Sequence, residues 1–173
     1  MIRLTIVAGA ALALAACTPN GGGAASAGSD AATAGETIRL ETGRCFGACP
    51  VYSVTVRPDG TGTFVGQQFT AVTGSRDFTL TPAQYRAFAA RLAPYRPTEG
   101  EQRYAPGSPL CPTYATDMSS IDVSWSGGAG GTRNLYFYLG CVSEDRPDAR
   151  TALRTAPELL PIAAFIGERP VGR

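Results

Sequence analysis

Two cysteines with three residues between them are the groups in this sequence best suited to chemistry. Cys45 and Cys49 lie in the stretch RCFGACPVY, residues 44–52, directly before residues that alternate as in a β-strand. Paired thiols of this kind serve as a redox dithiol, as ligands of a soft metal, or as a structural disulfide. The surrounding elements and the cellular compartment decide between these roles.

The sequence lacks features that the redox and metal roles require. A reactive dithiol sits at a helix N-terminus, which lowers the thiol pKa, whereas residues 51–56 here favour a strand. The Cys-x-x-x-Cys-Pro spacing resembles the copper motif of the Sco family of copper chaperones, which also needs a downstream histidine. The chain contains no histidine, and the spacing is not the paired Cys-x-x-Cys typical of zinc sites. Thiol redox or copper handling by this pair is kept as the alternative hypothesis, and no cofactor is expected.

The residue composition excludes several classes of catalytic mechanism. The absence of histidine excludes Ser-His-Asp and Cys-His catalysis, and the absence of lysine excludes Ser-Lys and Schiff-base chemistry. Carboxylates remain, and a cell-wall hydrolase using Glu99, Glu101, Asp117 or Asp122 is a second alternative. No spacing selects a pair among them, so we expect no catalytic residue.

The N-terminus predicts export and lipid attachment. A basic residue, Arg3, precedes an apolar run, residues 4–14, that is too short to span a bilayer. Residues 14–17, Leu-Ala-Ala-Cys, resemble a bacterial lipobox, with residues 1–16 as the signal peptide and Cys17 as the lipidated residue. Thr18, in place of Asp, resembles the pattern of outer-membrane lipoproteins. We therefore expect an anchor in the outer membrane that faces the periplasm, with the membrane as a partner.

Residues 17–36 are predicted to be the lipidated cysteine and a flexible Gly/Ala/Ser tether, since they contain no large apolar side chain. Residues 37–173 have the size of one domain. Removal of Arg3 leaves 14 arginines (15 − 1) against 14 acidic residues. This balance argues against a nucleic-acid partner, which requires a basic excess.

The pattern along this domain predicts an α+β fold. Alternating residues predict strands at 37–41, 51–57, 61–66 and 121–126, an apolar run predicts another at 135–139, and one or two shorter strands are expected between 68 and 80. Pro58-Asp59-Gly60 and Gly127–Gly131 are expected to join hairpins. Thr81 to Gln84 forms a capping box before a helical stripe, and two short helices are expected to meet near Ala156. We expect a mostly antiparallel sheet of about five to six strands with two helical segments packed on it, and a Pro-rich connection over residues 96–117.

Four cysteines remain after Cys17, and an even number in an exported domain favours disulfides. Gly47 permits the turn that would bring Cys45 to Cys49, and Pro50 holds Cys49 extended at the start of the strand. We favour the pairs Cys45–Cys49 and Cys111–Cys141, while cross pairings stay open.

The stretch CFGACPVYSVTVRPDGTGTFVG, residues 45–66, resembles the signature of a bacterial domain of unknown function, DUF family 6438. The positions that carry the resemblance are Cys45, Phe46, Gly47, Cys49, Pro50, Tyr52, Asp59, Gly60, Phe64 and Gly66. The resemblance implies an exported, often lipid-anchored α+β domain and implies no activity; Cys111 and Cys141 fall outside the signature. The expected function is that of a non-enzymatic envelope lipoprotein, a disulfide-stapled binding or structural module in the periplasm.

Overall fold

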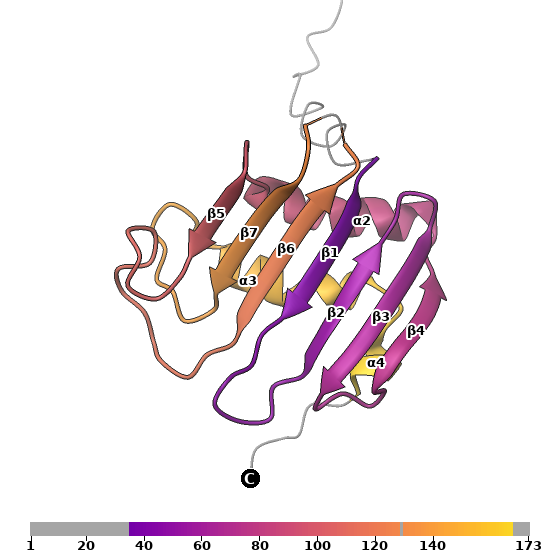
Figure 1. Ribbon diagram of the computed structural model, residues 1–173, viewed down its shortest axis with the longest axis horizontal. Helices are drawn as coiled ribbons and strands as arrows, with labels where there is room; N and C mark the ends of the chain where they lie inside the picture. Colours follow the sequence, from indigo (N-terminus) through magenta and orange to yellow (C-terminus); the bar gives the residue numbers. More distant parts are fainter. Residues whose placement is uncertain (1–34, 129, 168–173) are drawn as a thin grey trace, which may run out of the picture.

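The computed structural model describes residues 35–128 and 130–167 (Figure 1). The signal peptide, Cys17 and most of the expected tether lie outside the described residues. The described chain forms a seven-stranded sheet in the order β4-β3-β2-β1-β6-β7-β5. Its strands are β1 Thr37–Thr42, β2 Val51–Val56, β3 Thr61–Gln68, β4 Gly74–Thr79, β5 Glu101–Tyr104, β6 Ser120–Ser126 and β7 Arg133–Tyr138.

The predicted hairpins are confirmed. β2 and β3 pair antiparallel around Pro58-Asp59-Gly60, where the Asp59 carboxylate accepts hydrogen bonds from the backbone N–H and the hydroxyl of Thr61. Gly60 has φ 86°, and a Cβ there would lie 2.8 Å from the carbonyl oxygen of Leu80, so glycine is required. β6 and β7 also pair antiparallel across the glycine-rich loop.

β5 is the strand that the sequence pattern did not predict. It lies inside the expected Pro-rich connection and pairs parallel with β7 at the edge of the sheet. Only Tyr104 of its four residues is fully buried, so the strand has no apolar alternation to reveal it. The sheet thus has seven strands, close to the five or six expected, and the predicted α+β class is confirmed.

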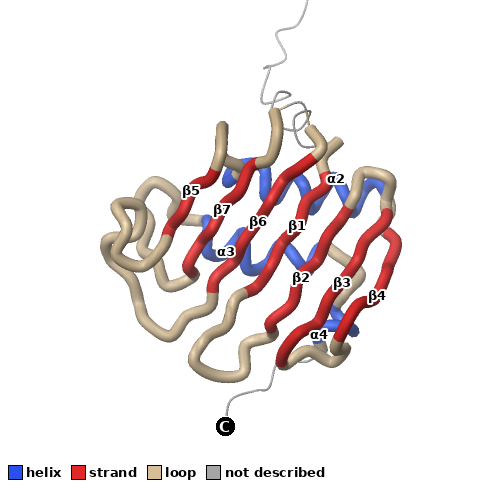
Figure 2. Tube along the Cα trace, viewed as in Figure 1, coloured by secondary structure: helices blue, strands red, loops and turns tan. Residues whose placement is uncertain are grey.

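The helices all lie on one face of the sheet (Figures 1 and 2). α2, Pro82–Leu92, begins at the predicted capping box, in which Thr81 and Gln84 each bond the other's backbone N–H. It buries Tyr85, Phe88 and Leu92 and continues into the short 3₁₀ helix η1, Ala93–Tyr95. The C-terminal helical pieces are α3 Ala149–Thr155, η2 Ala156–Leu159 and α4 Ala163–Ile166, so they meet at Ala156 as expected.

The core fills the space between this helical layer and the sheet. Alternate strand residues point into it, including Ile38, Val54, Phe64, Trp125 and Phe137, all essentially inaccessible to solvent. The opposite face of the sheet carries no helix in the described part of the chain. Among residues 35–128 and 130–167, none of the helices is long and apolar enough to cross a membrane.

The folded part begins one residue earlier than the tether prediction implied. Glu36, expected at the end of the tether, is fully buried. Its carboxylate accepts hydrogen bonds from both Nε and Nη2 of Arg96, with Nε to Oε2 at 3.0 Å. The small residues before Glu36 give no sign of this role in the sequence. The partner, Arg96, lies 60 residues away.

Candidate functional site

The loop between β1 and β2 is closed by the Cys45–Cys49 disulfide, with Cα atoms 5.8 Å apart. Gly47 inside the ring has φ 136°, a conformation that side chains rarely adopt, which explains the glycine. The base of the loop is fixed by Thr42, whose hydroxyl bonds the Pro50 carbonyl at 2.9 Å and accepts the Tyr52 N–H at 3.0 Å. The loop is therefore held in one shape at both its base and its tip.

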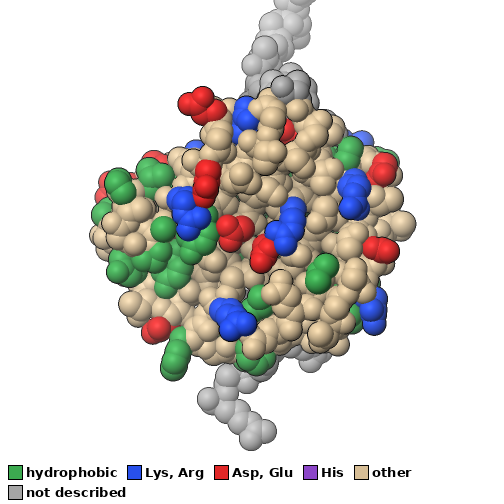
Figure 3. Space-filling view, viewed as in Figure 1, with side chains coloured by type: hydrophobic (Ala, Val, Ile, Leu, Met, Phe, Trp, Pro, Cys, Tyr) green, Lys and Arg blue, Asp and Glu red, His purple; other side chains and the backbone are tan. Residues whose placement is uncertain are grey.

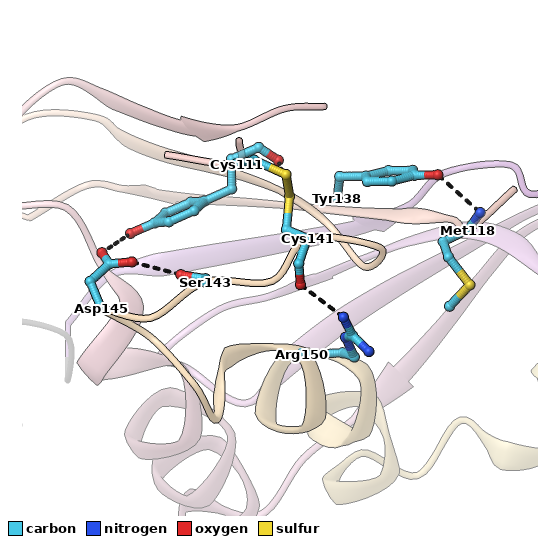
Figure 4. Close-up of a disulfide and its surroundings, with 8 residues drawn as sticks. Cys111, Met118, Tyr138, Cys141, Ser143, Asp145 and Arg150 are labelled. Atoms are coloured by element: carbon cyan, nitrogen blue, oxygen red, sulfur yellow. Dashed lines mark hydrogen bonds between the residues drawn. A yellow bond between two sulfur atoms is a disulfide. The ribbon is translucent and has the colours of Figure 1, made fainter. Parts of the chain in front are cut away.

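The second disulfide, Cys111–Cys141, lies in the core with Cα atoms 5.4 Å apart (Figure 4). It ties the long connection after β5 to the end of β7, and Arg150 of α3 donates a hydrogen bond to the Cys141 carbonyl at 2.8 Å. The two pairings are those that the sequence favoured. They differ in environment, since Cys45 and Cys49 are partly exposed whereas Cys111 and Cys141 are buried.

The two disulfides brace one continuous surface, here called the end surface, at the edge of the sheet where β1 and β7 end. The Phe46 N–H donates to the Asp117 carbonyl at 3.1 Å, which joins the disulfide loop to the connection before β6. The next residue, Met118, donates its N–H to the Tyr138 hydroxyl at 3.1 Å (Figure 4). The Tyr138 ring meets that of Tyr114 edge to face, with centroids 6.3 Å apart. The end surface comprises Phe46, Tyr114, Met118, Tyr138 and Val142.

Most residues of the signature have a structural task. The cysteines and Gly47 shape the loop, and Asp59 and Gly60 shape the next turn. Tyr52 is buried with its ring stacked on Phe64, 5.3 Å between centroids. Phe46 differs, because its side chain is 87% exposed at the tip of the closed loop. The signature includes Phe46 but does not distinguish it from a core residue, because exposure depends on the direction of the loop.

A second candidate surface is the open face of the sheet. Its outward residues form two rows across β1, β6, β7 and β5, given by the strand register. The first row is Glu41, Asp122, Tyr136 and Arg103, and the second is Arg39, Ser124, Asn134 and Glu101. A hollow of about 420 Å³ lies over these rows. Figure 3 shows charged side chains gathered at the middle of this face, beside an apolar area over the β5 side.

Among the described residues, some charged side chains of the open face form ion pairs with each other, and one carboxylate does not. Arg39 pairs with Glu41 at 2.5 Å and Arg103 with Glu101 at 3.0 Å, and the Arg103 guanidinium lies 4.2 Å from the centre of the Tyr136 ring. Asp122 stands directly opposite Glu41 in the register. Loss of hydration and the Glu41 carboxylate raise the pKa of Asp122 above its ordinary value.

The four predicted carboxylates are only partly brought together. Glu101 and Asp122 line the hollow, whereas Glu99 lies in the loop before β5 and Asp117 in the connection before β6. Arg39, Glu41 and Arg103 were missed as site residues, although their alternation with buried strand residues was a visible signal. Among the described residues there is no cluster of three or more His, Cys, Asp or Glu side chains suited to a metal ion.

Comparison with known proteins adds a family and no activity. The model of a domain of unknown function, DUF6438, matches residues 36–158, which span every strand, the helices from α2 to α3 and all but the last residue of η2. Among curated proteins, none matches the chain. The family match covers well over half of the sequence and starts at the buried Glu36. The chain belongs to the DUF6438 family of domains of unknown function.

Proposed function

We propose that this chain is a lipid-anchored, non-enzymatic binding domain of the bacterial envelope, which contacts a protein partner through its end surface. The observation that carries the proposal is the exposure of Phe46, 87% on a loop that a disulfide closes. An aromatic ring left in water contributes nothing to folding, and large exposed apolar groups in clusters mark interaction sites.

The geometry suits recognition because the ring is displayed on a constrained backbone. Binding costs less entropy when the contacting loop is already fixed, and aromatic residues dominate the energetics of protein interfaces. Phe46 protrudes, while Tyr114, Met118 and Val142 provide a partly exposed apolar surround. A partner with an apolar pocket for one aromatic ring would match this shape.

The cellular setting of the proposal comes from the sequence. Residues 14–17 resemble a lipobox with Cys17 as the lipidated residue, and Thr18 favours the outer membrane. Two disulfides in the folded domain agree with an oxidising compartment such as the periplasm. The domain would thus act on the periplasmic side, anchored to the membrane through its N-terminus.

The test is site-specific photo-crosslinking in cells. Phe46 is replaced by a photoreactive phenylalanine in the full-length chain, and Phe69, half exposed on the turn after β3, is the matched control. We expect a discrete protein adduct from position 46 that position 69 does not give. The proposal fails if position 46 gives no adduct at native expression, or the same adducts as position 69.

A second candidate function is favoured by one observation, the partial exposure of the Cys45–Cys49 disulfide. An accessible disulfide can exchange with external thiols, as a redox or copper-handling protein requires. Thiol trapping in cells distinguishes it: a functional redox pair is found partly reduced, whereas a structural one is found fully oxidised. Copper analysis of the reduced protein tests the metal variant of this hypothesis.

A further inference from the structure

We propose that the open face of the sheet binds the same face of a second copy of this chain. The open face adjoins the end surface at Tyr138, which projects from the same side of β7 as Tyr136, but the two rows that carry the proposal contain no residue of the end surface. It begins with the arrangement of charge at the four corners of the two rows. Glu41 and Arg39 occupy β1, while Arg103 and Glu101 occupy β5, so each row has one acidic and one basic corner.

Such a pattern is complementary to itself. Two facing copies can be related by a two-fold axis parallel to the strands, between β6 and β7. This operation places Glu41 opposite Arg103 of the second copy and Arg39 opposite its Glu101. A symmetric dimer uses the same patch on both copies, so each favourable pair occurs twice. The in-plane axis perpendicular to the strands also sets every basic corner against an acidic one.

The inner positions of the rows are complementary under the same operation. Asp122, which has no ion pair or hydrogen bond among the described residues, comes opposite the Tyr136 hydroxyl of the second copy. Ser124 comes opposite Asn134, and both side chains donate and accept hydrogen bonds. A donor for Asp122 would offset the unfavourable position of this carboxylate opposite Glu41.

The ion pairs within each copy do not prevent the formation of these pairs between copies. Arg39–Glu41 and Arg103–Glu101 join residues two apart on one strand and remain well exposed, and such pairs contribute little to folding. Their long side chains can reach across the roughly 10 Å that separates two packed sheets.

The shared area is that of a small interface. With the axis between β6 and β7 the two copies overlap over β1, β6, β7 and β5, and four strands spaced about 4.8 Å apart, each about 20 Å long, present roughly 380 Å² in projection. A standard interface buries about 800 Å² on each partner, so this shared face is about half of that size. A polar dimer of this size is weak and salt-sensitive, and attachment of both copies to one membrane would favour it.

The experiment uses two full-length copies with different C-terminal tags, co-expressed and co-purified in detergent. One variant, R39E/R103E, makes the corners all acidic, and another, E41R/E101R, makes them all basic. The matched control is R86E/R154E, which reverses two exposed arginines on α2 and α3, in the helical layer. Circular dichroism confirms that each variant is folded.

We expect wild-type copies to co-purify at low salt and to lose at least tenfold in yield at 0.5 M salt, a concentration that screens charges beyond about 4 Å. When both copies carry the same corner variant, the yield of co-purified protein should fall by a similar factor. An acidic copy and a basic copy should instead pair with each other. The control should behave as wild type. The proposal is overturned if wild-type copies do not co-purify, if the mixed corner variants do not recover, or if all variants co-purify equally through the shared anchor.

Discussion

At the scale of single residues, the buried ion pair at the start of β1 has the clearest energetic role. Glu36 and Arg96 form two hydrogen bonds in a site closed by Tyr85, whose hydroxyl donates to the Glu36 carbonyl. A buried pair contributes modestly when it is complete, but removal of one partner leaves a charge without compensation. The pair therefore ties the point where the chain enters the sheet to the end of the helical layer.

We predict that Arg96→Met lowers the free energy of unfolding by about 3–5 kcal/mol, because the Glu36 carboxylate remains buried without a partner. Urea denaturation measures the change. The matched control is Arg91→Met, which removes only an exposed contact with Thr155 and should cost less than about 1 kcal/mol. Equal effects at the two positions would contradict the assigned role of the pair.

Residue roles were predictable from the sequence where they depend on near neighbours. Gly47 and Gly60 were expected in turns, and both adopt positive φ. Glu36 was not predictable, because its burial depends on Arg96, 60 residues away. The exposure of Phe46 was equally hidden, since an aromatic residue in a motif is ordinarily part of the core.

At the scale of elements, the capping box of α2 combines local and tertiary effects. The Thr81 hydroxyl accepts the Gln84 N–H at 3.2 Å, and the Gln84 side chain accepts the Thr81 N–H at 2.9 Å. These bonds satisfy two backbone donors at the N-terminus of the main core helix. They fix where α2 begins and so which of its residues face the sheet.

Thr81→Ala should lower the free energy of unfolding by about 1 kcal/mol, because the hydroxyl acceptor for the first turn is lost. Chemical denaturation with α-helical circular dichroism is the measurement. Thr151→Ala, on the exposed face of α3, is the control; alanine favours helix there, so no loss is expected. A loss at Thr151 as large as that at Thr81 would show that capping is not the cause.

Elements with a strong local signal were predicted, and β5 was not. Alternation over five or more residues predicted β1, β2, β3 and β6, and the capping box predicted the start of α2. β5 has four residues and gains its place from parallel pairing with β7. Such pairing depends on the finished sheet, which a local pattern does not contain.

At the scale of the whole molecule, the disulfides have different consequences for stability. Cys111–Cys141 spans 30 residues and is buried, whereas Cys45–Cys49 spans four and lies at the surface. Loop-closure entropy alone gives about 3.7 kcal/mol for the long span and about 2 kcal/mol for the short one. The long disulfide should therefore protect the fold, while the short one shapes the end surface.

Accordingly, Cys111→Ser/Cys141→Ser should lower the Tm markedly more than Cys45→Ser/Cys49→Ser, since it also places two hydroxyls in the core. Thermal unfolding of the purified variants measures both changes side by side. The Cys45/Cys49 variant should retain its near-UV signal, because the core aromatic residues are untouched. A Tm loss that is larger for the surface pair would refute this division of roles.

The order of the strands has a consequence for how the chain reaches its folded state. β1 comes first in the sequence yet lies in the middle of the sheet, between β2 and β6. Its pairing with β6 joins residues 79 to 89 positions apart, so the centre of the sheet cannot close until residue 126 is available. Contacts over such separations form slowly. For an exported chain, as proposed here, the centre of the sheet would therefore assemble only after most of the chain has emerged on the far side of the membrane.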